Sequence, residues 1–217
     1  MIKMYGFWRS AASFRVRMAM NLKNISYEET MINLDTGEQH KEEYLCVNTQ
    51  AVVPSLIVDD GPPLTQSMAI LEYLEELYPD PPLLPKDARG RQRVRSLSQI
   101  FVADHHPLIV PRIRSFLTGT LGLPAETRDA WLRHWFREGM VNGEKKLADD
   151  PATGRFCHGD TLTIADLCML SHALATRHYK IDFSDLPVIS RIVENCLGVD
   201  AIARAVPLKQ PGAPSGH

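Results

Sequence analysis

The chain has 217 residues, of which 44% are hydrophobic and 23% are charged, values typical of a soluble globular protein. Its formal net charge of -2 provides no broad positive field, so we expect neither nucleic acid nor an acidic membrane surface as a partner. No stretch approaches the roughly 20 apolar residues that span a bilayer, and we expect no signal peptide.

Residues 1–80 predict alternating strands and helices. Residues 1–7 are typical of a short buried strand, residues 12–23 have the apolar spacing of a helix, and residues 27–33 predict a second strand. Because a helix connects these two strands, they should be parallel. The apolar run that ends at Val58 precedes Asp59-Asp60-Gly61, a hairpin signal, and Ser67 is expected to cap the helix that follows. These elements predict a four-stranded mixed sheet.

The remainder of the chain predicts helices. A proline-rich segment, residues 81–88, is expected to be a stiff linker between two domains. Residues 89–217 are expected to form an all-helical domain, with helical periods over residues 89–117, 128–148, 163–176 and 187–196. Thr163-Ile164-Ala165-Asp166 has the form of a helix capping box.

This organisation resembles that of the glutathione transferases, in which an α/β thioredoxin-like domain precedes an all-α domain. Val53-Pro54 resembles the family's Val-Pro, whose proline is cis and whose Val backbone pairs with glutathione. Gln66-Ser67 resembles the pair that holds the γ-glutamyl end of glutathione, and WRSAASFRVRMAMNLK resembles the signature of the zeta class. The resemblance covers nearly the whole chain. It implies a cytoplasmic homodimer that isomerises maleylacetoacetate or maleylpyruvate with glutathione, in aromatic catabolism.

Ser10 lies where the first predicted strand meets the first predicted helix. A hydroxyl and the N–H groups of a helix N-terminus can stabilise a thiolate and lower a thiol pKa that is about 8.5 when free. The resemblance assigns this role to Ser10, with glutathione as the thiol. Ala11 and Ala12 complete the glutathione loop where the zeta motif has Ser and Cys, so the mixed-disulfide chemistry of related reductive dehalogenases loses its residue. Two alternatives stay open: Ser10 is only the N-cap of the helix, or Ser13 is the hydroxyl donor or the cap instead.

The resemblance implies a mechanism in which the glutathione thiolate adds to a cis double bond, the bond rotates, and the thiolate leaves. The substrate is a dianion, and arginine suits carboxylates because its planar guanidinium donates two parallel bonds. The candidate catalytic arginines are Arg9, Arg112 and Arg177, with His178 as an alternative to Arg177. The simpler interpretation of each is a solvated surface charge.

Further positions complete the predicted glutathione site. His106 occupies a position that reaches glutathione or substrate in zeta relatives. Gln39 lies in a loop where these relatives have a Gln, and His40 beside it is also expected in the site. The alternative for both Gln39 and His40 is a solvated loop. Ile109-Val110 replaces the Asn-Asn common in the family, which predicts a more apolar pocket wall and a possible change of substrate.

We expect no metal site. Adjacent His105 and His106 would point about 100° apart on a helix, with no third ligand at a matching spacing. The four cysteines form no CxxC pair, which favours reduced thiols.

Two other functions compete with the isomerase. The first is general glutathione conjugation, or dechlorination of small α-halo acids, by the same thiolate. The second is a non-catalytic glutathione-fold binding protein, which would be indifferent to Ser10→Ala. The combination of Ser10, Val53-Pro54 and Gln66-Ser67 makes that second alternative the weakest.

Overall fold

The structure, a computed structural model, describes residues 1–214, and for His178 it describes the backbone alone. The chain forms two compact units. The first contains Met1–Pro82 together with the segment that begins at Gly198, and the second contains Leu83–Leu197. None of the described helices is both long enough and apolar enough to cross a membrane.

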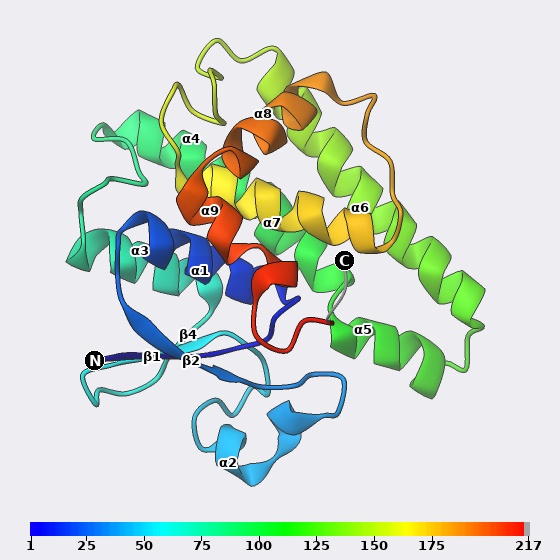
Figure 1. Cartoon of the computed structure of the whole chain (residues 1–217). Helices are drawn as coiled ribbons and strands as arrows, with labels where there is room; N and C mark the ends of the chain where they lie inside the picture. The colour runs from blue at the N-terminus through cyan, green and yellow to red at the C-terminus, as the bar shows by residue number, and fades with distance from the viewer. Residues whose placement is uncertain (215–217) are drawn as a thin grey trace. The chain divides into compact units, whose positions relative to one another are not determined.

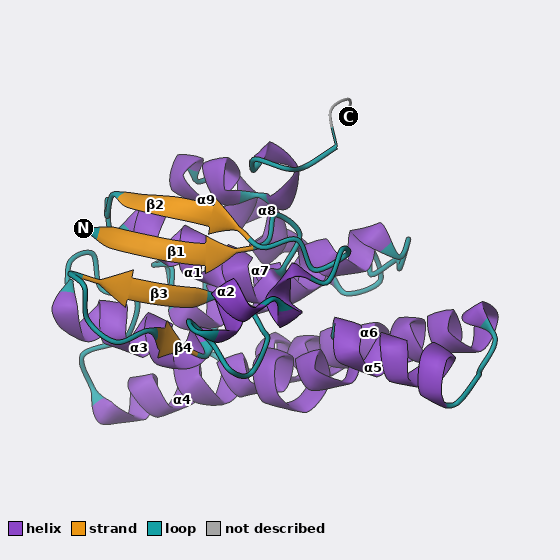
Figure 2. Cartoon of the chain, turned by 90° about the horizontal axis from the view of Figure 1, so that it is seen from below, coloured by secondary structure: helices purple, strands orange, loops and turns teal. Residues whose placement is uncertain are grey.

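The first unit is built on a four-stranded sheet with the strand order β2-β1-β3-β4 (Figure 2). The strands are β1 (Ile2–Gly6), β2 (Tyr27–Met31), β3 (Ser55–Val58) and β4 (Leu64–Thr65). β1 pairs in parallel with β2 and antiparallel with β3, and β3 pairs antiparallel with β4. The predicted mixed sheet, with its parallel crossover and hairpin, is therefore confirmed, although β2 ends at Met31 rather than residue 33.

Two helices, α1 (Ala11–Leu22) and α3 (Ser67–Leu77), contact each other on one face of the sheet, and α2 (Glu42–Leu45) lies on the other (Figure 1). A turn of 3-10 helix, Glu38–His40, precedes α2. Asn24, at φ 53, ends α1 in the left-handed conformation that asparagine tolerates. The prediction that Ser67 caps α3 is wrong. Gln66 holds the N-cap position at φ 67, and Ser67 is the first helical residue.

The predicted boundaries placed the segment after residue 198 in the helical domain. In the structure this segment forms α9 (Asp200–Ala205), which contacts α1 in the first unit. The Asn21 side chain donates to the carbonyl oxygen of Ala201 at 3.0 Å. Sequence periodicity missed this short helix, and its buried Ile202 shows that it completes the apolar cover of α1.

The second unit is helical, as predicted. A segment broken by Pro107 and Pro111 runs through α4 (Ala88–Gln99), a π-helical turn Ile100–His105, a 3-10 turn His106–Leu108, α5 (Pro111–Ser115) and a second π turn Phe116–Thr120. The other helices are α6 (Ala125–Ala148), α7 (Ile164–His178) and α8 (Pro187–Leu197).

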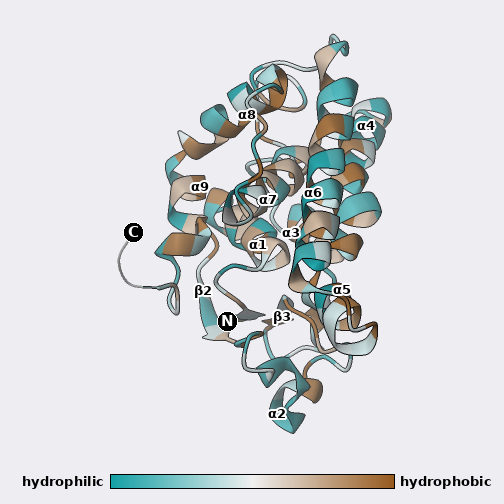
Figure 3. Ribbon diagram, turned by 90° about the vertical axis from the view of Figure 1, so that its right-hand side faces the viewer, coloured by the Kyte–Doolittle hydropathy of each residue, from teal (hydrophilic) through white to brown (hydrophobic). Residues whose placement is uncertain are grey.

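α7 is the central helix of this unit. It contacts α4, α6 and α8, and residues from Ile164 to Leu170 are fully buried. The predicted capping box at its start is present, and Asp166 accepts from the Thr163 backbone N–H at 2.8 Å. α8, in contrast, alternates hydrophobic and hydrophilic residues along its turns, as expected for a helix buried on one face (Figure 3).

Candidate functional site

Ser10 is the N-cap of α1, directly after the turn that leaves β1. Its side chain is half-buried, and its Oγ accepts from the backbone N–H of Ser13 at 3.2 Å. A hydroxyl also carries one O–H donor, and that donor has no acceptor among the residues that the structure describes. Ala11 and Ala12 are the first helical residues, whose N–H groups have no intrahelical acceptor, and the first turn contains no carboxylate. This end of α1 is therefore suited to stabilising an anion.

Ser13, the alternative hydroxyl, has a structural role. It is fully buried, and its Oγ accepts from the backbone N–H of Phe7 at 3.3 Å. Ser10 is therefore both the cap of α1 and the more accessible of the two hydroxyls. The sequence left capping and anion stabilisation open as alternative roles of Ser10. One hydroxyl can perform both, because capping uses a lone pair of the oxygen and leaves the O–H available as a donor.

The turn before Ser10 is held by a buried ion pair. The Arg17 side chain is completely buried, and its Nε donates to Glu29 on β2 at 2.8 Å. Nη2 donates to the carbonyl oxygen of Phe7 at 2.9 Å and Nη1 to that of Trp8 at 3.3 Å. A Cβ atom at Gly6 would overlap the Glu29 carboxylate, so a larger residue there would displace that carboxylate. Arg17 thus fixes the backbone that presents Ser10.

Arg9 lies beside Ser10 but is already engaged. Its guanidinium forms an ion pair with Asp35 and lies 5.5 Å from the Phe7 ring centroid and 5.9 Å from that of Trp8. Its side chain is 30% exposed, against 52% for Asp35. Arg9 is therefore held near the turn by Asp35. A substrate carboxylate that binds Arg9 would have to displace the Asp35 carboxylate or bind beside it.

The sheet places Val53, Pro54 and Gln66 near the end where β1 leads into α1. The Val53-Pro54 peptide is cis, as the resemblance implies, and it immediately precedes β3. Ser55 of β3 pairs with Tyr5 near the end of β1 and with Thr65 of β4. Pro54 directly precedes Ser55 and Gln66 directly follows Thr65, so both are adjacent to these paired residues. The backbone N–H and C=O of Val53 have no hydrogen-bond partner among the described residues.

Gln66 contacts Gln50, a residue that the sequence analysis did not include in the site. Its Nε2 donates to Oε1 of Gln50 at 2.9 Å. The backbone N–H of Gln50 is in turn held by Asn48 Oδ1 at 3.0 Å. Gln50 precedes Val53-Pro54 by only a few residues. This closeness in sequence was the signal that could have pointed to Gln50 as a site residue.

Gln39 remains a prediction with one supporting feature. It lies in the 3-10 turn before α2, and its Oε1 is buried without a hydrogen-bond partner in the described chain. Buried carbonyl oxygens are normally satisfied, so this atom is suited to accept from a ligand. The neighbouring His40 is exposed.

The two adjacent histidines of the second unit have different environments. His105 is 5% exposed, and its Nδ1 lies 2.7 Å from the carbonyl oxygen of Ile100, so it is a structural histidine. Its ring centroid lies 6.4 Å from those of Trp135 and His172, in a tilted and an edge-on arrangement respectively. His106 is half-buried at the start of the following 3-10 turn, and its predicted role stays a prediction.

The predicted substrate arginines of the second unit are exposed. Arg112 lies on α5, and Arg177 lies in the last turn of α7, with both side chains open to solvent. The side chain of His178, the alternative, lies outside the described structure. A third arginine, Arg114, was not predicted. Its Nη1 donates to the Tyr179 hydroxyl at 2.7 Å, which links α5 to the end of α7.

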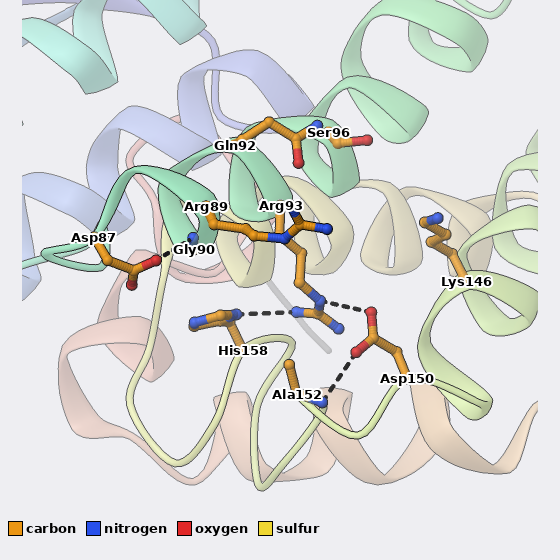
Figure 4. A pocket seen from close by; sticks show the side chains of 10 residues that line it. All are labelled: Asp87, Arg89, Gly90, Gln92, Arg93, Ser96, Lys146, Asp150, Ala152 and His158. Carbon is orange, nitrogen blue, oxygen red and sulfur yellow. Dashed lines mark hydrogen bonds and ion pairs between the residues drawn. The ribbon is translucent and has the colours of Figure 1, made fainter.

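A separate hollow of about 570 Å³ lies beside the start of α4 (Figure 4). Arg93 projects into it and donates to Asp150, Thr153 and the carbonyl oxygen of Cys157, and it also contacts His158. The hydrogen bond from Arg93 holds the pKa of Asp150 below its usual value. Because each nitrogen of Arg93 already contacts the protein, this hollow is a structural junction between α4 and the loop after α6.

No cysteine lies in the Ser10 turn. All four thiols are free, with Cys46 exposed and the others buried at positions 157, 168 and 196. Burial raises the pKa of the Cys157 and Cys196 thiols, which keeps them protonated and unreactive. The nucleophilic sulfur that the Ser10 turn is suited to stabilise must therefore come from a ligand.

A thioredoxin-like sheet with a cis Val-Pro and a helix-capping hydroxyl, joined to a helical unit, defines the glutathione transferase class. Residues 1–76 match the model of the glutathione S-transferase N-terminal domain. The maleylpyruvate isomerase of a Ralstonia species is 41% identical over 97% of this chain and 99% of its own length. The chain belongs to the zeta class of the glutathione transferases, the family of the maleylacetoacetate and maleylpyruvate isomerases.

Solved structures agree with this assignment. A maleylacetoacetate isomerase from Methylobacterium extorquens, with bound malonate and glutathione, is 52% identical and superposes with a TM-score of 0.96 over 98% of this chain and 100% of its own. A holo maleylpyruvate isomerase, described as a bacterial zeta-class glutathione transferase, is 40% identical with a TM-score of 0.94, over 98% of this chain and 100% of its own.

Proposed function

We propose that this chain is a glutathione-dependent cis–trans isomerase of a maleyl keto acid, maleylacetoacetate or maleylpyruvate, and that it forms the fumaryl product. The observation that carries the proposal is the Ser10 hydroxyl, which caps α1 and whose O–H donor has no acceptor among the described residues. The similarity to isomerases over nearly the full length of both chains supports the reaction class.

The residues of the first unit fit glutathione. The unpaired backbone of Val53 offers a donor and an acceptor to an extended peptide, and the buried Oε1 of Gln39 offers an acceptor. Gln66, held by Gln50, lies at the start of α3, whose N-terminal N–H groups attract a carboxylate. Val53 and Gln66 come from separate segments of the chain, and both lie next to the paired residues Ser55 and Thr65, which supports a shared ligand.

Bound glutathione supplies the sulfur that adds to the maleyl double bond and then leaves it. Ser10 donates its O–H toward that sulfur and stabilises the negative charge, which lowers the thiol pKa. The free N–H groups of Ala11 and Ala12 add the partial positive charge of the helix N-terminus. Arg9, and the arginines of the second unit, provide cations for the carboxylates of the substrate.

The decisive experiment follows the absorbance loss of maleylpyruvate and of maleylacetoacetate with the purified protein. Turnover is expected with glutathione and is expected to disappear without it. No turnover of either substrate above background at high enzyme concentration would contradict the proposal. The comparison of kcat/KM for the two substrates also identifies the preferred keto acid. Chloride release from dichloroacetate in place of isomerisation would favour the dehalogenase alternative.

We propose further that the enzyme acts in aromatic catabolism, in the cytoplasm, as a homodimer. The free state of all four cysteines supports a reducing compartment, and the zeta-class resemblance supports the dimer. Light scattering on the purified protein tests the dimer directly, because the chain mass is 24.4 kDa and a dimer has twice that mass.

A further inference from the structure

Arg114 differs from the other arginine on α5 in its burial. Arg112 is exposed, whereas Arg114 is half-buried, and its Nε is a buried atom without a hydrogen-bond partner in the described chain. Residues two positions apart on a helix point about 200° from each other, which explains why one faces solvent and the other faces the protein. Arg114, which was not among the predicted substrate arginines, is therefore the arginine of α5 that faces the protein.

No carboxylate among the described residues pairs with Arg114. None of the ion pairs within the described residues includes it. Arg93 and Arg137, in contrast, are each paired with an aspartate. A partly desolvated cation without an acid partner is unfavourable, so an anion from outside the chain would stabilise it.

The anchor of Arg114 is the hydroxyl of Tyr179, whose ring lies in an apolar cluster. Tyr179 packs with Ile109 and Phe136, and its ring centroid lies 5.1 Å from that of Phe136. The hydroxyl accepts from Nη1 at 2.7 Å, which fixes the guanidinium without neutralising it. A fixed guanidinium without an acid partner among the described residues is suited to binding a carboxylate.

The same hydrogen bond brings together the two segments that carry the predicted substrate arginines. Arg114 lies on α5 with Arg112, and Tyr179 follows Arg177 at the end of α7. We propose that Arg114, oriented by Tyr179, binds a carboxylate of the substrate and sets the preference for dianionic substrates. This inference rests on the proposed isomerase function and adds a specificity-determining residue to it.

The test compares Arg114→Met with Arg133→Met, which removes an exposed arginine on α6 that has no described partner. Arg114→Met is expected to raise KM for the maleyl substrate by about 10- to 100-fold with little change in kcat. It should weaken malonate binding by a similar factor in calorimetry with glutathione present. The affinity for glutathione, and all constants of Arg133→Met, should stay within about two-fold of the wild type.

Two further variants separate binding from stability. Arg114→Lys keeps the charge but loses the planar fork, and it should fall between wild type and Arg114→Met. Tyr179→Phe keeps the ring and removes only the anchoring oxygen, so KM should rise by about 3- to 10-fold. These two variants carry the test if Arg114→Met does not fold.

Three results would overturn the inference. The first is a KM and a malonate Kd within about two-fold of wild type in Arg114→Met, or in both milder variants. The second is an equal loss of glutathione affinity, which indicates a structural role. The third is a wild-type protein that does not bind malonate. If the wild type binds malonate through Arg114 but isomerises neither keto acid, the proposed function fails while this site stands.

Discussion

Arg17 on α1 and Glu29 on β2 form an ion pair in which the arginine side chain is completely buried and the glutamate is 12% exposed. The same guanidinium donates to the carbonyl oxygens of Phe7 and Trp8, just before Ser10. This pair therefore joins the parallel strands to the turn that presents the functional hydroxyl.

Arg17→Met should destabilise the protein strongly, because it leaves the Glu29 carboxylate without its partner. We expect a loss of about 3–5 kcal/mol in the free energy of unfolding, measured by urea denaturation. The double variant Arg17→Met/Glu29→Met removes both charges and should recover part of this loss. A single variant as stable as the wild type would show that the pair does not support the turn.

Ser10→Ala should impair chemistry more than folding. The bound thiol loses its O–H donor, so kcat should fall by about 10- to 1,000-fold. The pH–rate profile should shift to higher pH, because the thiol pKa rises when its anion is less stabilised. Ser10→Thr keeps the hydroxyl and serves as the control, which should retain the profile of the wild type. An unshifted profile in Ser10→Ala would assign the thiolate to another donor.

Asp166→Ala should destabilise the helical unit. The carboxylate is completely buried and accepts from the N–H groups of Cys157, at 2.7 Å, and Thr163, at 2.8 Å. Its removal leaves both donors unsatisfied, so we expect a loss of about 2–4 kcal/mol. Glu194→Ala, at an exposed position on α8, should change the free energy of unfolding by less than about 0.5 kcal/mol. Equal melting temperatures for the two variants would contradict this role.

Acid should destabilise the helical unit through Asp150 and Asp185. Hydrogen bonds from Arg93 and Arg137, respectively, lower the pKa of these carboxyls. A lowered folded-state pKa contributes stability above the unfolded value of about 3.9, and this contribution is lost as the pH falls through the folded value. The melting temperature should therefore fall below about pH 4. Asp150→Asn should show less of this acid loss than Asp149→Asn, the matched change at its exposed neighbour. Identical acid profiles would contradict the assignment.

The sequence predicted the first unit well because its signals are local. The apolar runs, the Asp59-Asp60-Gly61 turn and the helix stop at Asn24 depend on neighbouring residues, and each has its counterpart in the structure. The capping box at Thr163 is equally local and is confirmed. The predicted cap of α3 was one position too late. Serine is a preferred N-cap residue, so the sequence favoured Ser67, whereas Gln66 holds this position at a positive φ.

The features that the sequence missed depend on tertiary contacts. α9 was missed because its six residues are too few to show a helical period, and only its contact with α1 defines its role. Arg114 was not predicted, because the sequence does not reveal which face of a five-residue helix points inward. The Gln50–Gln66 bond joins residues 16 positions apart, and no local pattern predicts it.

The order of the segments has a consequence for synthesis. α1 leaves the ribosome well before α9, which contacts it, because Asn21 and its partner Ala201 are 180 residues apart. The whole helical unit is translated in between. The nascent thioredoxin-like unit therefore exposes part of α1 to water, and to chaperones, until α9 emerges.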